Sequence, residues 1–582
     1  MSRHLDSFRA GDTPGVLLGW RAMDMRPAIS ARRDSLERLQ SEAFDLLVVG
    51  GGITGAGVAL DAAARGLRVA IVDQNDFASG TSSKSSKLIH GGLRYLQQGD
   101  VALVYEALHE RQRLLRNAPH LVRTLPFMIP VMTRDGVVSR KIARALGSAL
   151  WMYDLTGGWR VGRLHRRLRA KKALAHMPTM RADRLSSAYL YFDAEADDAR
   201  LTLALVQSAI ERGAVAVNYC TVTSLLKKST EGSPHRNEQI SGATVRTYEG
   251  RTVDVRARVV VNATGVWGDA MRRMDIGGDV TTIRPAKGIH ITVPWELVQN
   301  DIAVVIPVPG DKRSLFVVPH MPNGDGTYRF TYVGTTDTDY QGSIDDPQCT
   351  EGDIDYCLRA LNNAVAGSRA ITRDDVVGTW AGLRPLVVSS DGEAATGRTA
   401  DLSRRHKVMV SDSGMVTITG GKLTTYRKMA EHTVDAALDV MRDDGTASDI
   451  RAKRCATKRL ALHGATSHDR DDHLVSRFGT LASSIREMIT LDPALGAPLI
   501  EGLPYLRAEA VYCARHELVV TLEDVLSRRL RGLLYDRHAT EAAAESTARL
   551  IAPELGWDEL RINAEVQKFY EICAHEVAAA RA

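Results

Sequence analysis

The chain has 582 residues, of which 44% are hydrophobic, so it can bury a large core and divide into two or three domains. Its formal net charge of +5 and its pI near 8.8 are mild for this length, which argues against nucleic-acid binding. The six cysteines lack CxxC or CxxH spacing, so the sequence predicts reduced thiols, no zinc site and no iron–sulfur cluster.

Residues 1–43 are predicted to form a polar N-terminal extension, because charged residues interrupt every apolar run. They lack the order of basic, apolar and small residues that marks a secretory signal. No segment of the sequence approaches the ~20 apolar residues that a membrane-spanning helix needs. We therefore expect a protein without a transmembrane span.

The next segment, from Phe44 to Asp73, reads FDLLVVGGGITGAGVALDAAARGLRVAIVD and predicts a strand, a glycine-rich turn, a helix and a second strand. Gly50 would make the tight turn, Gly52 would let the backbone approach a pyrophosphate, and Gly55 would let the helix pack on the strand. The phosphate would lie at the positive helix N-terminus. Asp73 lies where a carboxylate accepts hydrogen bonds from a ribose, and its charge favours FAD or NAD over NADP. An ordinary strand-to-helix turn is the weaker alternative.

Helices and strands alternate further along the chain. The patterns predict helices over 100–117, 201–212 and 423–438, strands over 126–130, 258–265, 289–293 and 314–319, and a polar hairpin around 231–237. From about residue 451 the pattern is almost entirely helical. We therefore predict a C-terminal helical domain over 446–582, after a linker near 443–448.

Seven motifs resemble FAD-dependent glycerol-3-phosphate dehydrogenases of the membrane-associated respiratory type. In chain order they are FDLLVVGGGITGAG, SSKSSKLIHGGLRYL, VVNATGVW, KGIHI, VGTTDTD, GLRP and TGGKLTTYRKMAEH, of which LIHGGLRYL and GGKLTTYRK are the most specific. The resemblance runs from about residue 44 to the C-terminus. It implies an α/β fold of the two-dinucleotide-binding-domain flavoprotein type. The FAD-binding and substrate domains would interleave over 44–445, and the substrate domain would contain a mixed β-sheet.

The resemblance implies FAD, which we expect to be held noncovalently. Three further groups of residues would contact it: Ser82, Ser85, Ser86, Lys87 and His90 along the flavin, Ala263 and Gly265 at a second backbone crossing, and Gly421 and Thr424 at the flavin end. A helix N-terminus after Gly421 would stabilise negative charge on the reduced ring. Two alternatives stay open here, because an ATG turn can simply end a strand and Lys87 can be a solvated surface lysine.

The resemblance also implies a substrate that carries a phosphate, which needs charge-assisted donors. The candidate substrate-binding residues by motif are Arg94, Tyr95, Arg384, Arg398 and Lys422. His290 is the candidate base for the hydroxyl proton, because histidine titrates near working pH. Arg384 would stabilise the developing charge on the substrate oxygen. The sequence leaves open which of His290 and Arg384 handles the proton.

The electron acceptor is predicted to be a membrane quinone, because no second complete GxGxxG unit and no cysteine cluster follow. The segment from Ser139 to Lys172 carries Leu146, Leu150, Trp151 and Tyr153 among arginines, which is typical of an interfacial helix beside anionic lipid. A solvated basic helix fits equally well. We expect a cytoplasmic homodimer that is peripherally associated with the inner face of the plasma membrane.

Two other functions stay open. An amine or hydroxy-acid oxidase of the same fold would use oxygen, and its carboxylate substrate would need similar cations. A flavin-binding protein whose FAD is only structural would give His290 and the cationic residues no reason to converge.

Overall fold

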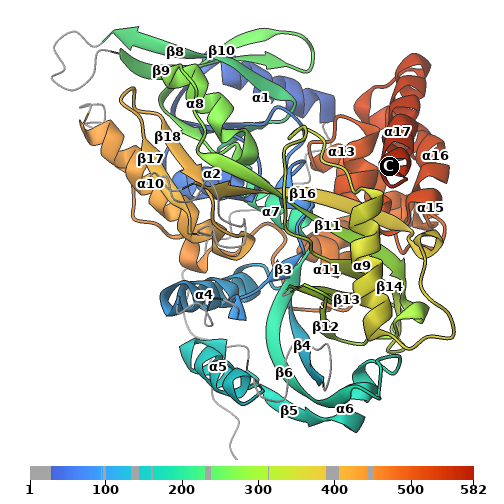
Figure 1. Ribbon diagram of the computed structural model, residues 1–582. Coiled ribbons are helices and arrows are strands. Elements are labelled where there is room, and N and C mark those ends of the chain that lie inside the picture. The colour runs from blue at the N-terminus through green and yellow to red at the C-terminus, as the bar shows by residue number, and fades with distance from the viewer. Residues whose placement is uncertain are drawn as a thin grey trace, which may run out of the picture.

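The computed structural model describes residues 28–93, 95, 100–132, 143–158, 162–229, 238–311, 313–388, 405–443 and 451–581. The structure contains two β-sheets, one above the other in the view of Figure 1. A group of helices from the C-terminal part of the chain packs beside both sheets. The fold is therefore α/β with a helical C-terminal domain, as predicted.

The first sheet has the strand order β17-β18-β10-β1-β2-β7. Its parallel strands are β1 (Ala43–Val49), β2 (Val69–Val72), β7 (Val215–Val217), β10 (Thr252–Asn262) and β18 (Val416–Thr419). The antiparallel strands β17 (Lys407–Val410), β9 (Glu238–Thr247) and β8 (Cys220–Ser229) extend it. The described part of β8 and β9 agrees with the predicted hairpin, whose turn lies outside the described residues.

Helices cover both faces of this sheet, which explains why its strands are continuous apolar runs. Leu46 and Val48 of β1 pack with α2 (Ile53–Ala64), α7 (Asp198–Ile210) and α10 (Tyr426–Asp443). Leu47 and Val49 point to the other face, where α1 (Ala28–Ser41) and α8 (Gly268–Ile276) lie. Helix α1 was not expected from the sequence, since only Leu36 and Leu39 of this polar helix are buried.

The second sheet is mixed, as predicted, with the order β15-β11-β14-β13-β12-β4-β6-β3; β16 pairs with β11 and β5 pairs with β6. Its strands are β3 (Leu88–Ile89), β4 (Val122–Met132), β5 (Arg166–Arg169), β6 (Leu185–Ala196), β11 (Ile283–Pro294), β12 (Ala303–Pro307), β13 (Ser314–Pro322), β14 (Tyr328–Gly334), β15 (Thr338–Asp339) and β16 (Gly378–Val387). The pair of β12 and β4 is parallel, whereas the other pairs are antiparallel.

The two faces of this sheet meet different partners. On one face, Ile289 and Val317 pack with Leu358 of α9 (Glu351–Ala364), near α6 (Ala170–His176). On the other face, Phe127 and Tyr332 belong to a core shared with α4 (Val101–Asn117), α5 (Ala143–Thr156) and the C-terminal helices. Asp100 caps α4 by accepting from the Leu103 N–H, so the predicted start of this helix is confirmed.

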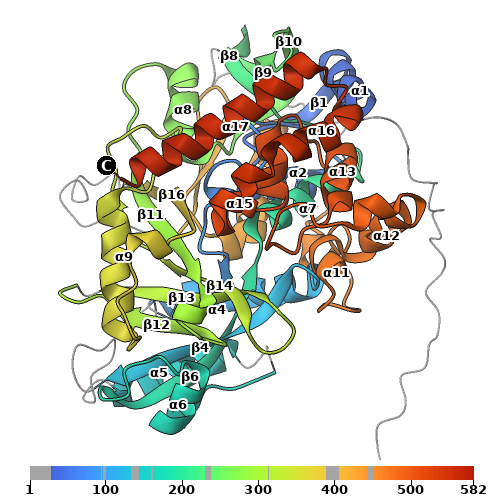
Figure 2. The ribbon, with the colours of Figure 1, turned by 90° about the vertical axis from the view of Figure 1, so that its right-hand side faces the viewer.

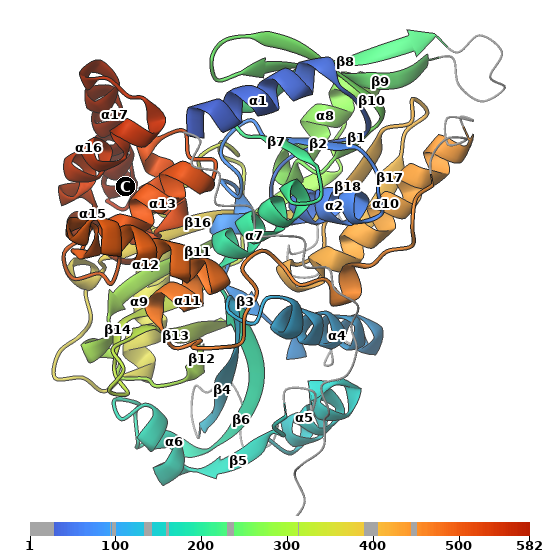
Figure 3. The ribbon, with the colours of Figure 1, turned by 180° about the vertical axis from the view of Figure 1, so that it is seen from behind.

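The C-terminal domain consists of helices only, apart from turns and one isolated bridge within residues 451–581. Its elements are α11 (His473–Phe478), α12 (Ala482–Leu491), α13 (Arg507–His516), the π-helical turn η12 (Asp524–Arg529), α14 (Gly532–Tyr535), α15 (Arg537–Ala542), α16 (Ala544–Leu555) and α17 (Glu559–Ala579). Figures 2 and 3 show this domain beside both α7 and β16. Buried ion pairs of Arg528 and Arg529 with Asp76 join it to the first sheet's layer.

Candidate active site

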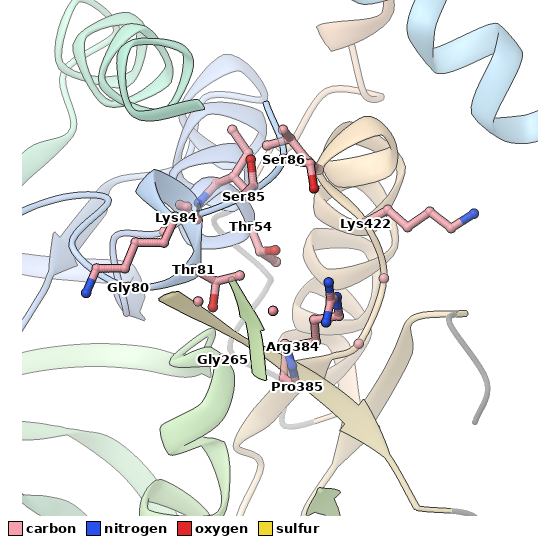
Figure 4. A pocket seen from close by; sticks show the side chains of 18 of the residues that line it. Thr54, Gly80, Thr81, Lys84, Ser85, Ser86, Gly265, Arg384, Pro385 and Lys422 are labelled. Carbon is pink, nitrogen blue, oxygen red and sulfur yellow. Dashed lines mark hydrogen bonds between the residues drawn. The ribbon is translucent and has the colours of Figure 1, made fainter. Parts of the chain in front are cut away.

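A cavity of about 1010 Å³ lies between the two sheets, at the carboxyl ends of the parallel strands of the first sheet. This edge of an α/β sheet is where ligands bind. Most of the predicted site residues line it: Gly50, Gly52, Asp73, Ser82, Ser85, Ser86, His90, Tyr95, Ala263, Gly265, His290, Arg384, Gly421, Lys422 and Thr424. Segments that are distant in sequence, such as Thr81, Gly265 and Arg384, meet in one place (Figure 4).

The glycine turn after β1 brings backbone very close to backbone. Gly50 has φ of +104°, and a Cβ there would lie 2.6 Å from the carbonyl oxygen of Ala263. A Cβ on Gly55 would lie 1.8 Å from the carbonyl oxygen of Gly50. Gly52 is the residue before α2, where the N–H of Ile53 donates to Ser82 Oγ at 2.8 Å. These positions exclude side chains and leave a narrow cradle at a helix N-terminus.

Asp73 follows β2 directly and lies at one end of the cavity. Its two carboxylate oxygens accept from the N–H groups of Gly51 at 2.6 Å and Asn75 at 2.8 Å. Burial raises the pKa of Asp73 to about 7, although these two backbone donors act in the opposite direction. Asp73 is thus fixed in orientation beside the glycine turn.

The turn between β18 and α10 also lines the cavity. Gly420 and Gly421 have φ of +75° and +80°, and the 3-10 turn η8 (Leu423–Thr425) follows them. Thr424 Oγ1 accepts from the N–H of His90 at 3.1 Å, which holds the predicted LIHGG and GGK motifs together. The cavity therefore extends from the end of β2 to the start of α10.

His290 lies on β11, and 2% of its surface is exposed. Its Nε2 lies 3.0 Å from Ser86 Oγ, whereas Nδ1 is buried without a hydrogen-bond partner among the described residues. Burial, assisted by the positive charges of Lys87 and Arg384, holds the pKa of His290 well below its usual value. The ring is therefore neutral at pH 7 and faces the cavity through Nε2 and Ser86.

Arg384 extends into the cavity from β16, where it lies opposite Ala286 of β11 in the register. Its Nη2 donates to Thr335 Oγ1 at 2.9 Å and to the Thr336 carbonyl at 3.1 Å, and Nη1 lies 3.4 Å from Asp337 Oδ1. Figure 4 shows its guanidinium on the side of the cavity facing Thr81, Ser85 and Ser86. Arg384, a cation held in place by hydrogen bonds, and His290, a neutral histidine, thus line the same cavity.

The other predicted cations differ in where they lie relative to the cavity. Lys422 lies over the Tyr95 ring, 3.8 Å from its centroid, and its side chain points away from Lys84 (Figure 4). Arg94 and Arg398 lie outside the described residues. Lys87 is buried behind Trp380, 4.3 Å from that ring, and does not line the cavity.

Several lining residues were not predicted. Thr335, Thr336 and Asp337 come from the VGTTDTD motif, so the motif itself could have identified them. Arg313 also lines the cavity and donates to the Asp337 carbonyl at 2.7 Å, but its sequence neighbourhood contains no recognisable signal.

The predicted interfacial helix needs a correction. Leu146, Leu150 and Tyr153 of α5 are buried against the second sheet, so they are unavailable to lipid. The exposed apolar residues of this helix are instead Trp151, Met152 and Leu155. The predicted basic helix is also wrong in part, because Arg166, Arg167 and Arg169 lie on strand β5, exposed to solvent. The apolar positions follow a helical period with two faces, and the sequence alone does not say which face is covered.

No helix among the described residues is long and apolar enough to cross a membrane.

Comparison with known proteins identifies similar chains over almost the whole length. The family described as FAD dependent oxidoreductase matches residues 45–427, and the C-terminal domain of alpha-glycerophosphate oxidase matches residues 418–562. Glycerol-3-phosphate dehydrogenase 2 of Mycobacterium bovis is 36% identical, covering 95% of this chain and 91% of that protein. The mitochondrial glycerol-3-phosphate dehydrogenase of Mesocricetus auratus is 35% identical, covering 94% of this chain and 75% of that protein.

A solved structure also resembles the fold described above. The glycerol-3-phosphate dehydrogenase of Bacillus halodurans, complexed with FAD, superimposes with a TM-score of 0.72 at 29% identity. The match covers 95% of this chain and 98% of that chain, so the helical C-terminal domain is included in it.

Proposed function

The chain belongs to the family of FAD-dependent glycerol-3-phosphate dehydrogenases, and on that premise we propose that it oxidises sn-glycerol 3-phosphate to dihydroxyacetone phosphate and passes the electrons to a membrane quinone. One observation carries the proposal. A single cavity connects the glycine turn and Asp73 with His290 and Arg384.

FAD fits this cavity noncovalently, and three features support that fit. The side-chain-free cradle at Gly50 and Gly52 suits a pyrophosphate at the N-terminus of α2. Asp73 would accept from the ribose hydroxyls, and the N-terminal end of α10 beyond Gly421 would lie at the flavin ring. When bound, FAD supplies the hydride acceptor for the oxidation.

His290 and Arg384 divide the remaining work on the substrate alcohol. A guanidinium stays protonated in proteins, so Arg384 cannot take the hydroxyl proton. It can stabilise negative charge on the substrate oxygen. Neutral His290 can accept the proton at Nε2, either directly or through the Ser86 hydroxyl at 3.0 Å. The lowered pKa of His290 keeps the ring unprotonated near neutral pH, and it also makes the imidazole a weaker base than a free histidine.

Lys422 and Tyr95, with Arg94 from the same GGLRYL motif, are the proposed phosphate-binding residues. A phosphate ester needs charge-assisted donors, which an uncharged glycerol does not. Arg398 belongs to this proposal by its motif alone.

The proposed membrane contact is the surface formed by Trp151, Met152, Leu155 and the exposed arginines of β5. Exposed aromatic and apolar side chains beside arginines suit the headgroup region of an anionic bilayer. This would place the enzyme peripherally on the inner face of the plasma membrane, where a quinone is available. The homodimer stays a prediction, which the mass of the purified enzyme in solution would test.

Anaerobic titration of the purified flavoprotein with glycerol 3-phosphate tests the proposal. We expect the flavin to bleach with glycerol 3-phosphate and not with D-amino acids, and the colour to return on adding a soluble quinone. Bleaching by an amino or hydroxy acid instead would indicate an oxidase, and reoxidation by oxygen but not by quinone would overturn the acceptor. A flavin that no substrate bleaches would indicate a structural cofactor.

A further inference from the structure

The C-terminal domain packs directly behind the proposed active site. The N–H and C=O groups of its segment 531–535 approach the second sheet so closely that a Cβ on Gly378 would lie 2.2 Å from the Leu534 carbonyl oxygen. Thr292 Oγ1 of β11 donates to that same oxygen at 2.9 Å. His290 is two residues away on the same strand, so this segment lies next to the reacting part of the cavity.

Arg531 is the residue of this segment that contacts the Ser83–Ser86 loop and Asp198. It has φ of +69°, which is unfavourable for a residue with a Cβ, and its side chain is 1% exposed. Its Nη2 donates to the Ser83 carbonyl at 2.5 Å and to Asp198 Oδ1 at 2.8 Å. Arg531 thus combines an unfavourable backbone conformation with a buried guanidinium that is hydrogen-bonded to Ser83 and Asp198.

Asp198 contacts both Arg531 and a residue that lines the cavity. Its Oδ2 accepts from both the N–H of Ser85 at 2.9 Å and the Ser85 hydroxyl at 2.7 Å, and Ser85 lines the cavity. Its Oδ1 lies 3.6 Å from Lys87 Nζ, which has no hydrogen-bond partner among the described residues. Asp198 is therefore a buried anion that fixes Ser85 and balances two buried cations.

Ser85 and its neighbour Ser86 in turn hold His290. The Ser85 carbonyl accepts from Trp380 Nε1 at 3.1 Å, and Trp380 stacks on the His290 ring. The Ser86 carbonyl accepts from the Tyr332 hydroxyl at 3.1 Å, while Ser86 Oγ contacts His290 Nε2. Polar contacts from Arg531 to Asp198, from Asp198 to Ser85 and from Ser86 to His290, joined by the peptide bond between the two serines, thus connect the C-terminal domain to the proposed base.

We infer that Arg531 is a positioning residue for the oxidation, which acts through Asp198 on Ser85, Ser86 and His290. This inference rests on the proposed function, because it assigns the C-terminal domain a part in that same site. Misplacing a reacting group by about 1 Å can cost about a hundredfold in rate. Losing Arg531 should therefore lower kcat more than it raises KM.

The alternative is that Arg531 only attaches one domain to another. The chain offers a matched control for that role in Glu517, which pairs with Arg200 of α7 at 2.7 and 3.0 Å in a contact that is also buried and joins the same layers. Neither Glu517 nor Arg200 lines the cavity. If Arg531 only holds the two layers together, replacing it should have the same kind of effect as replacing Glu517, namely a loss of stability without a specific loss of kcat.

The test compares the holoenzymes of Arg531→Met, Arg531→Lys, Ser85→Ala and Glu517→Gln with wild type. We expect Arg531→Met to lower kcat for glycerol 3-phosphate by about tenfold to a hundredfold with KM changed less than about threefold. Arg531→Lys should recover part of the rate. The flavin reduction potential should shift in Arg531→Met and stay at the wild-type value in Glu517→Gln, even where both variants lower the melting temperature.

Ser85→Ala removes only a hydroxyl, so it remains informative if Arg531→Met fails to fold. In the double variant of Ser85→Ala and Arg531→Lys the losses in kcat should be less than additive, because both act on one series of contacts. Wild-type kcat and potential in Ser85→Ala and Arg531→Lys would overturn the inference, as would equal changes in kcat and potential for Glu517→Gln. If wild-type enzyme does not oxidise glycerol 3-phosphate, the proposed function fails, and the flavin potential alone decides the role of Arg531.

Discussion

The imidazole of His290 stacks on the indole of Trp380, with ring centroids 4.7 Å apart and an interplanar angle of 11°. This stacking fixes the plane of the histidine, and Ser86 fixes its rotation through Nε2. A neutral imidazole with both degrees of freedom constrained is prepared to accept a proton without rearrangement.

His290→Gln should therefore lower kcat by about 10²- to 10⁴-fold, as expected for the loss of a general base. Because burial, Lys87 and Arg384 lower the pKa of His290, the folded enzyme keeps this ring neutral as the pH falls through 6.5. The ratio of kcat/KM between wild type and variant should then be constant from pH 8 to pH 6. A ratio that halves near pH 6.5 would contradict the lowered pKa.

His320 provides the control for that substitution. It also packs against Tyr332, and burial lowers its pKa to about 3, yet it does not line the cavity. His320→Gln should leave kcat within about twofold of wild type.

At pH 8, where Asp73 with its pKa of about 7 is ionised, Asp73→Ala should weaken FAD retention by about ten- to a hundredfold, because a charge-assisted acceptor contributes about 1.5–3 kcal/mol. Equilibrium dialysis of FAD from the apoprotein would measure this. Asp254→Ala changes a carboxylate on strand β10 that accepts from Thr244 Oγ1 at 2.7 Å, and it should not change the affinity. Unchanged FAD affinity in Asp73→Ala would disprove the ribose contact.

Lys422→Ala should raise KM for glycerol 3-phosphate about ten- to a hundredfold and barely change the oxidation of unphosphorylated glycerol, since the lost charge–charge contact belongs to the phosphate. Steady-state kinetics with both substrates tests this. Lys428→Ala is the matched control, because Lys428 pairs with Glu431 and does not line the cavity. Equal losses for both substrates would assign Lys422 to the flavin or the fold.

Trp151→Ser with Leu155→Ser should reduce binding to anionic vesicles, and so should replacing Arg166, Arg167 and Arg169 with glutamate, because each arginine near an anionic surface contributes about 1 kcal/mol. Vesicle sedimentation at low and high salt measures both effects. The control is Leu491→Ser with Leu560→Ser, which changes leucines that are 79% and 80% exposed on the C-terminal domain. Equal binding of all variants to neutral and anionic vesicles would exclude this surface as the anchor.

Glu517→Gln should also change how the protein responds to acid. Burial alone would raise the pKa of Glu517, but Arg200 and Arg529 outweigh it and lower the pKa to about 2. A carboxyl group with a depressed folded-state pKa stabilises the protein fully above about pH 4.5 and loses that contribution as the pH falls toward 2. Denaturant titrations should show a loss on the order of 3 kcal/mol at pH 7 in the variant and a flatter dependence on pH below 4.5.

The sequence predicted best those parts whose geometry is local. The strand, turn and helix around Gly50 and Gly55 require one another within a few residues, and the structure has them as predicted. The orientation of α5 was not predictable. Leu150 and Trp151 are both apolar, and only the position of the second sheet decides that Leu150 is buried and Trp151 is exposed. Arg531 had no signal at all, since its partner Asp198 lies 333 residues earlier and neither residue belongs to a recognisable motif.

The long sequence separations of the buried ion pairs bear on the order in which the chain can fold. Asp198 and Asp76 are made 333 and 453 residues before the arginines that neutralise them. Until the last part of the chain leaves the ribosome, Asp76 lacks both of its arginines and Asp198 has only Lys87 beside it, so burying these carboxylates carries a desolvation penalty. The Ser83–Ser86 segment then lacks its contact with Arg531. We therefore expect FAD to bind only after the C-terminal helices have docked.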